Sequence, residues 1–189
     1  MMYEMRVLLI GEFSRLHNTL KEGLTTLNHD VTLVGTNDGF KNFPVDFNFE
    51  ATFFSKSALR PMVKAIDKIT SINLVQIENA FRFYRLLSVL KDYDVVQLIN
   101  ENSIKTHPKL EIWLLKKLKK QNKKLFLMSC GADHSSIKFA VDKKLKYSIL
   151  TPYLQDKTLK DQYRFMLRYL SQPYVKLHEY LFQNVVGVI

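Results

Sequence analysis

Four short apolar runs, separated by helical patterns, constrain what this sequence can fold into. The runs cover residues 5–10, 30–35, 94–99 and 124–129, and each is nearly continuous. Runs of this kind are typical of strands buried on both faces of a parallel sheet. Because helices join these strands, the sequence predicts an α/β protein whose mainly parallel sheet lies between helical layers, a three-layer α/β/α domain.

Leucine spacing defines the first helix of the chain. Leu16, Leu20, Leu24 and Leu27 recur at spacings of four, four and three residues, which places them on one helical face. Asn28 is expected to end this helix, because asparagine tolerates the left-handed backbone conformation that often follows a helix.

The remaining elements rest on single signals. We expect a weaker strand at 47–54, a helix with Pro61 in its first turn, a helix over 74–93, and a helical stretch over 158–184 that Pro173 kinks or breaks. A further helix should bury a stripe made of Leu110, Trp113, Leu114 and Leu118.

Polar residues follow the expected strands, at the positions where parallel sheets bind ligands. In open α/β sheets the ligand lies beyond the carboxyl ends of the strands. This rule selects the loops at residues 11–17, 36–43, 100–106 and 130–136. The residues expected to line a substrate or acceptor cleft there are Gly11, Glu12, Ser14, His17, Asn100, Glu101, Gly131, Asp133 and His134.

Known nucleotide and catalytic motifs are absent from these loops. A dinucleotide site needs G-x-G-x-x-G after the first strand, whereas the sequence has GEFSRL from Gly11 onward, with one glycine of three. A Walker loop, the paired acids of a phosphorelay receiver and the Gly-x-Ser-x-Gly elbow of a hydrolase do not occur either. His107, His134 and His178 are scattered along the sequence, so no metal site is predicted.

Residues 131–134, GADH, are the most informative loop, and two roles stay open for each polar residue in it. Asp133 is either a helix N-cap or a ligand-binding carboxylate, and His134 is either a solvated histidine or a catalytic candidate. Cys130 is either a buried thiol at a strand end or a nucleophile. The catalytic residues therefore remain unassigned, with His134 and Asp133 as candidates.

The charge of the chain is strongly basic, and the excess is local. Its formal net charge is +10, and eight lysines but one acid, Glu111, lie between Lys105 and Lys124. This lysine patch is a solvated helix face, an anionic membrane contact or a nucleic-acid contact. Since no aromatic or arginine residues interleave the lysines, membrane is favoured over nucleic acid. The patch comprises Lys116, Lys117, Lys119, Lys120, Lys123 and Lys124.

The cellular placement follows from the apolar runs and from cysteine usage. No run approaches the ~20 apolar residues that a membrane-spanning helix needs, and the start of the chain lacks the features of a signal peptide. Cys130 is the single cysteine, which excludes an internal disulfide and fits a reducing compartment. We expect a cytoplasmic protein, with the inner face of the membrane as the place where the lysine patch would act.

Several segments together resemble a known family. The order Gly11, His17, the leucine face and the Asn28-His29-Asp30-Val31 entry into the second strand is similar to the opening of GT-B glycosyltransferases, particularly family 4. YDVVQLIN at 93–100 and KKLFLMSCGADH at 123–134 resemble the strands that lead into the cleft of that family. VVGVI at the end resembles the strand at which its second domain begins.

The resemblance implies a domain organisation. Residues 1–184 would form the Rossmann-like N-terminal, acceptor-side domain, the N-terminal half of a GT-B fold. Residues 185–189 would begin the linker to a second domain, at which this sequence is truncated, and the terminal strand should pair with neighbours that are not supplied here.

The resemblance also implies an activity. The whole enzyme would be a retaining, metal-independent transferase without a cofactor, which moves a sugar from a nucleotide-sugar to a saccharide or lipid-linked acceptor. Gly11 would lie near the donor phosphate, His17 would open the first helix, and Gly131, Asp133 and His134 would line the cleft. Cys130 stands where the family often has histidine. The alternative is a stand-alone, non-catalytic Rossmann-like binding module with a basic surface facing a membrane or a partner.

Overall fold

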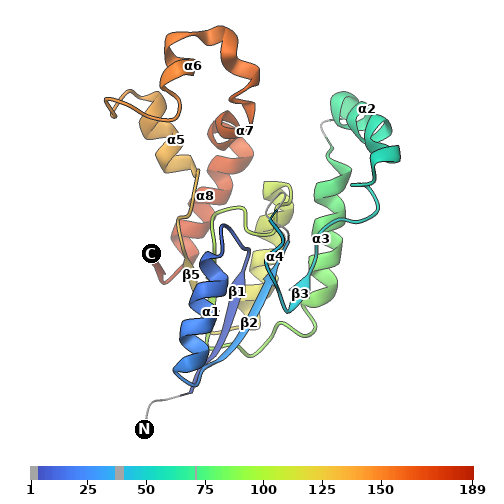
Figure 1. The fold of residues 1–189 in the computed structure, drawn as a ribbon, viewed down its shortest axis with the longest axis vertical. Helices are drawn as coiled ribbons and strands as arrows, with labels where there is room; N and C mark the ends of the chain where they lie inside the picture. Colours follow the sequence, from blue (N-terminus) through green and yellow to red (C-terminus); the bar gives the residue numbers. More distant parts are fainter. Residues whose placement is uncertain (1–3, 37–40, 71) are drawn as a thin grey trace.

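A single parallel sheet forms the centre of the protein (Figure 1). The structure is a computed structural model that describes residues 4–36, 41–70 and 72–189. Every strand pairing in the described part is parallel, which confirms the α/β class predicted from the apolar runs. The strands are β1 Arg6–Ile10, β2 Asp30–Gly35, β3 Phe47–Asn48, β4 Val95–Leu98, β5 Lys124–Leu127 and β6 Gly187–Val188.

The strand order is β3-β2-β1-β4-β5-β6, the order of a Rossmann-like sheet. The chain starts in the middle with β1, winds outward to β3, and then crosses over to β4 on the other side of β1. The loops after β1 and β4 therefore diverge at the point where the winding reverses. That point is where ligands bind in folds of this type.

Helices cover both faces of the sheet and give the three-layer architecture. The helix α1, Leu16–Thr26, packs through Leu20 and Leu24 on the β1–β2 face that carries Val7 and Leu9. The opposite face packs against the helices α3 Leu74–Leu86, α4 Pro108–Lys120 and α8 Gln172–Asn184. The alternation of side chains along β1 therefore supplies both cores.

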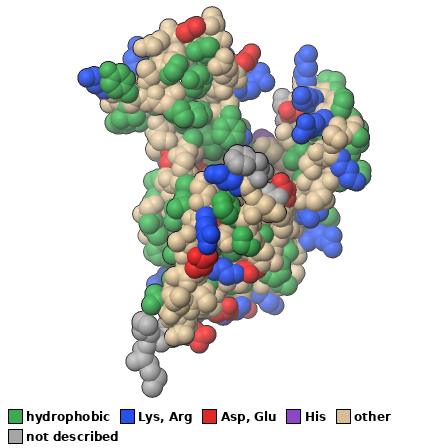
Figure 2. Space-filling model, viewed as in Figure 1, with side chains coloured by type: hydrophobic (Ala, Val, Ile, Leu, Met, Phe, Trp, Pro, Cys, Tyr) green, Lys and Arg blue, Asp and Glu red, His purple; other side chains and the backbone are tan. Residues whose placement is uncertain are grey.

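Two lobes extend beyond the carboxyl edge of the sheet (Figure 1). One has its own small core of Ile137, Ala140, Leu150, Tyr169 and Tyr174. It contains α5 His134–Val141, α6 Thr151–Gln155, η2 Lys157–Asp161, α7 Arg164–Leu167 and η3 Arg168–Leu170. The other consists of η1 Ser57–Leu59 and α2 Arg60–Thr70. Figure 2 shows the molecular surface hollowed between the two lobes.

Most sequence predictions about single elements are confirmed. Asn28 follows α1 with a φ of 61°, in the left-handed region. Pro61 lies in the first turn of α2, and the helical stretch over 158–184 is broken before α8, which Pro173 helps to begin. The strand expected over 47–54 shrinks to β3, two residues long.

The terminal strand differs from the expectation that its neighbours are not supplied here. β6 pairs with β5 in parallel, and Val186 N–H donates to Leu125 O at 2.7 Å. The strand therefore continues the same six-stranded sheet. The division of the chain at residue 184 stays a prediction.

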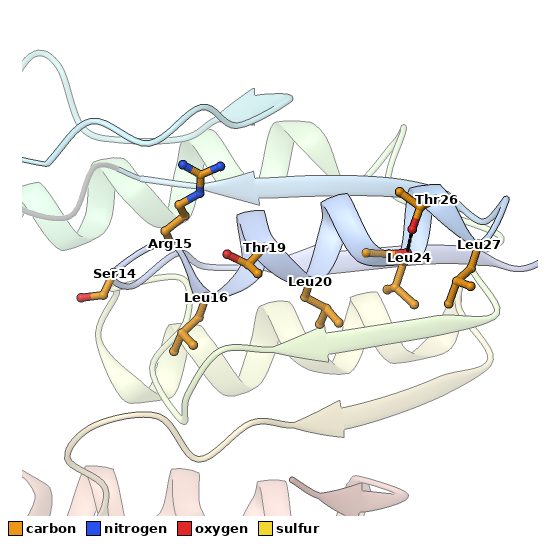
Figure 3. A pocket seen from close by; sticks show the side chains of 9 residues that line it. Ser14, Arg15, Leu16, Thr19, Leu20, Leu24, Thr26 and Leu27 are labelled. Carbon is orange, nitrogen blue, oxygen red and sulfur yellow. Dashed lines mark hydrogen bonds between the residues drawn. The ribbon is translucent and has the colours of Figure 1, made fainter.

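Two predicted apolar faces are less buried than their spacing suggested. Leu16 and Leu27 of α1 are 43% and 47% exposed, because the helix packs on the sheet through the middle of its leucine face. Figure 3 shows this face along a shallow surface groove. On α4, Leu114 and Leu118 are buried, but Trp113 is 44% exposed and stacks on Tyr84 instead.

Candidate functional site

The loops after β1, β4 and β5 meet at the carboxyl edge of the sheet, as the sequence predicted. β4 lies between β1 and β5, and Ile99 joins the loops because its N–H donates to Ile10 O at 2.9 Å and its carbonyl accepts from Cys130 N–H at 3.2 Å. The loop 36–43 follows β2 on the far side of β1, and its residues 37–40 lie outside the described residues. The site is therefore built from residues 11–17, 100–106 and 130–136.

Gly11 opens the first loop, and its neighbours explain why glycine is required there. Its φ of 87° lies in the left-handed region, and a Cβ atom would stand 2.3 Å from Cγ2 of Ile99. A side chain would therefore be strained and would also collide with the loop after β4.

Glu12 fills the N-terminus of α1 with its own carboxylate. Its side chain is buried, 1% exposed, and Oε2 accepts hydrogen bonds from Asn18 N–H at 2.8 Å and from Asn18 Nδ2 at 2.6 Å. Arg15, at the N-cap, contributes no capping hydrogen bond from its side chain, which pairs with Glu22 instead. In dinucleotide-binding folds this helix end receives the phosphate. Here the carboxyl group of Glu12 already takes the N–H of Asn18, so this N–H is not available to a phosphate group.

His17 supports the first loop from inside the protein. It is fully buried, and its Nδ1 lies 2.7 Å from Gly11 O. Burial lowers the pKa of His17 to about 4, although the bond to Gly11 acts in the opposite direction. The imidazole is therefore neutral at pH 7, Nδ1–H donates to Gly11 O, and Nε2 faces Gln97 at 3.4 Å. Of the predicted cleft residues, His17 positions the loop and does not reach its surface.

A buried acid that the cleft prediction missed holds the loop after β4. Glu111 of α4 accepts hydrogen bonds from Ile104 N–H at 2.8 Å, Asn102 Nδ2 at 3.0 Å and Thr106 N–H at 3.4 Å. Complete burial raises the pKa of Glu111 to about 8, although the bonds from Ile104 and Thr106 oppose this rise. Asn100 also serves the fold of this loop, since its Oδ1 accepts from Asn102 N–H at 3.1 Å.

Glu101 joins this loop to α5 and α8. It is buried, 1% exposed, and its Oε1 lies 2.5 Å from Nδ1 of His178, while Oε2 accepts from His134 N–H at 3.3 Å. Burial raises the pKa of Glu101, against the lowering influence of His178. Glu101 is therefore a deep acceptor at the centre of the site.

Asp133 is the N-cap of α5. Its Oδ1 accepts from Ser136 N–H at 2.6 Å, and Ser136 Oγ accepts in turn from Asp133 N–H, which makes a capping box. Burial raises the pKa of Asp133, but bonds from Ser129 and Ser136 outweigh it and hold that pKa below its usual range. Of the two roles left open, the structure shows the cap.

His134 and Gly131 lie at the rim of the site. His134 Nδ1 lies 2.9 Å from Tyr169 O, and its ring centroid is 5.0 Å from that of His178. Gly131 is exposed, has a φ of 85°, and has no atom within 4 Å of the place where a Cβ would stand. Glycine is therefore required there by the backbone conformation, and the space beside it is open.

Ser14, in the first loop, receives a hydrogen bond from Lys41 Nζ at 3.5 Å.

Sequence reasoning missed two central residues for different reasons. Glu111 carried a signal, because it is the one acid in a lysine-rich helix and an acid there needs buried partners. His178 carried none, since it lies 77 residues from Glu101 and reaches it through the packing of α8.

The lysine patch lies at the other edge of the sheet. α4 runs antiparallel to β4 and β5, so its C-terminal lysines lie near the start of β5, at the amino edge. The helix has 13 residues, which separates its ends by about 20 Å at ~1.5 Å per residue. Several of these lysines have partners, among them Asp94 for Lys123 and Asn184 for Lys119. The patch and the candidate site are therefore separate surfaces.

Neither a metal cluster nor a membrane span is found in the described part of the chain. No three or more His, Cys, Asp and Glu side chains among these residues are arranged to hold a metal ion. None of the described helices has the length and apolar character needed to cross a bilayer.

The chain matches no protein-family model, no curated protein and no solved structure. The protein is therefore classified here by its fold and by the geometry of its site. It is a Rossmann-like α/β/α protein in which Glu12 caps the first helix and polar residues gather at the ends of β4 and β5.

Proposed function

We propose that this chain is the acceptor-side, Rossmann-like part of a glycosyltransferase. In this proposal the loops at the carboxyl edge bind a saccharide or lipid-linked acceptor. The nucleotide-sugar is bound mainly by a further domain, and the transfer is retaining and needs no metal. The order of motifs along the sequence supports the family, and the sheet order supports the fold.

The observation that carries the proposal is the carboxylate of Glu12 at the start of α1. A domain that grips a nucleotide diphosphate through this helix must leave its first-turn N–H groups open to phosphate. Glu12 takes the Asn18 N–H at 2.8 Å and adds a negative charge beside it. A domain built this way is suited to the uncharged hydroxyl groups of a sugar acceptor.

The polar groups of the site are suited to hydroxyl recognition. His134 and His178 place two imidazoles near each other, and the buried carboxylate of Glu101 holds both residues in position. Hydroxyl groups both donate and accept, so imidazoles held in this way can bind them. Closure against a second domain would exclude water and align the acceptor with the donor sugar.

The rim of the hollow between the lobes favours an acceptor that carries phosphate. Lys64 and Lys68 of α2 and Arg164 of α7 line one cavity there, with Asp67 as the single acid. A saccharide linked to a lipid through a diphosphate would meet this positive rim while its sugar reaches the polar loops.

Saturation-transfer NMR with two ligand panels tests the proposal. We expect signals from saccharides and from saccharide diphosphates, and none from dinucleotide cofactors. Glu101→Gln should weaken saccharide binding by about tenfold, the equivalent of ~1.4 kcal/mol. Glu22→Gln on α1 is the matched control, since Glu22 is an exposed acid outside the loops that form the site.

Two results would contradict the proposal. One is binding of a dinucleotide with the same affinity in the wild type and in Glu101→Gln, which would indicate a cofactor-binding domain. No response to any saccharide, together with sedimentation on phosphatidylserine vesicles, would favour the non-catalytic module with a basic surface.

A further inference from the structure

We propose that Ser135, His178 and Glu101 form a nucleophile–base–acid triad that cleaves carboxylic esters. The proposal does not depend on glycosyl transfer. It rests on a chain of two contacts, Ser135 Oγ to His178 Nε2 at 3.4 Å and His178 Nδ1 to Glu101 Oε1 at 2.5 Å. Triads are recognised by this geometry and not by the order of their residues in the sequence.

Glu101 fixes the orientation and the tautomer of His178. Because the carboxylate can only accept when ionised, Nδ1 carries the proton and Nε2 presents its lone pair to the serine hydroxyl. Glu101 is buried and is held from its other oxygen by His134 N–H. The ring of Phe182 lies 4.2 Å from the imidazole and restrains it from the side. The base is therefore aligned before any substrate arrives.

Ser135 occupies the position that suits a nucleophile. It is exposed, it lies in the first turn of α5, and the positive end of a helix stabilises developing negative charge. The neighbouring first-turn N–H groups of His134 and Ser136 donate to Glu101 and Asp133. Ser135 N–H has no acceptor among the described residues, so it can donate to the oxyanion of a tetrahedral intermediate.

A surface groove brings a substrate to the serine. It runs between α5 and α8, and Phe139 and Val175 give it an apolar wall beside Ser135 and His178. An acyl chain can lie on this wall with its carbonyl carbon at Ser135 Oγ. The geometry therefore points to an ester with an apolar acyl group.

The reaction balances without a cofactor. Ser135 Oγ bonds to the acyl carbon and passes its proton to His178 Nε2; the ester C–O bond then breaks and the alcohol leaves with that proton. Water attacks the acyl-serine ester, gives a proton to Nε2, and the serine oxygen departs and takes it back. The products are one carboxylic acid and one alcohol for each ester and water consumed.

Covalent labelling with a fluorophosphonate probe, followed by peptide mass spectrometry, is the direct test. We expect the adduct on Ser135, and we expect hydrolysis of p-nitrophenyl butyrate to fall at least ~100-fold in Ser135→Ala and in His178→Gln. Ser88→Ala is the control, because this exposed hydroxyl lies just after α3, outside the groove between α5 and α8. It should keep both the label and the rate.

Two outcomes would overturn the triad. One is the absence of a probe adduct on Ser135 in the folded wild-type chain. The other is labelling of Ser135 at an unchanged rate in His178→Gln or Glu101→Gln, with the fold of each variant verified by circular dichroism. Because Ser135 is exposed, Ser135→Ala should fold, so its ester hydrolysis decides the role of the hydroxyl even where the other variants unfold.

Discussion

At the scale of single residues, two buried carboxyl groups shape the site without facing a ligand. Glu12 caps α1 through the N–H and the side-chain amide of Asn18, and Glu111 holds the loop after β4 through backbone N–H groups. Buried polar groups are costly unless hydrogen bonds satisfy them. Their positions are therefore fixed by the loops they hold, which makes both loops rigid before a ligand binds.

Glu111 predicts a loss of stability as the pH rises from about 4.5 to about 8. Its pKa is raised from 4.5 to about 8 in the folded chain, so between these values the folded chain keeps a proton that the unfolded chain releases. The free energy of unfolding therefore falls as the pH rises, by up to ~1.4 kcal/mol per pH unit. His17 acts in the opposite direction between about 4 and 6.5, so the loss should be clearest above 6.5.

Urea unfolding across this pH range measures the effect. The Glu111→Gln variant should be less stable than the wild type at low pH but should lose the decline above 6.5. An equal decline in both proteins would show that Glu111 is not the group responsible.

Residue roles were only partly predictable from the sequence. The N-cap role of Asp133 was one of two alternatives, because aspartate before a helical pattern commonly caps it. Sequence spacing could not predict that Glu12 caps α1, because Glu12 lies three residues before the N-cap residue of this helix. The reason is that two residues of the intervening loop, Ser14 and Arg15, have positive φ values of 51° and 69° and fold the chain back.

At the scale of elements, Gly11 after β1 and Gly23 within α1 should respond in opposite ways to substitution by alanine. Gly11→Ala should lower the free energy of unfolding by at least ~2 kcal/mol, because of its positive φ and the contact with Ile99. Gly23→Ala, in the middle of α1 with no atom within 4 Å of its Cβ, should raise it by up to ~1 kcal/mol. Thermal or urea unfolding of the two variants gives the comparison. Equal effects of the two changes would contradict the described path of the first loop.

Strands were more predictable than helix faces. A short, near-continuous apolar run bounded by polar residues strongly favours a buried strand, and β2 begins and ends where its run did. The leucine spacing of α1 fixed a helical face but not how much of it the sheet would cover. Burial depends on the neighbouring strands: Leu20 and Leu24 join the core that lies on the sheet, whereas Leu16 and Leu27, at the two ends of the face, stay half exposed.

At the scale of the whole molecule, the lysine patch and the polar site lie at opposite edges of the sheet. A membrane bound by the lysine patch would leave the carboxyl edge pointing away from the lipid. A lipid-linked acceptor would instead be met by the rim that Lys64, Lys68 and Arg164 form between the lobes. The sequence located the lysines but not this separation, which follows from the antiparallel course of α4.

The most direct test of the proposed site is an amide chemical-shift titration of the ¹⁵N-labelled chain with uridine diphosphate and with a saccharide identified by saturation transfer. We expect the saccharide to shift amides in residues 100–106 and 130–136, while the nucleotide leaves the amides of Leu16, His17 and Asn18 unchanged. A saturable shift of these three amides with the nucleotide would contradict the proposal, because the start of α1 would then be open to phosphate.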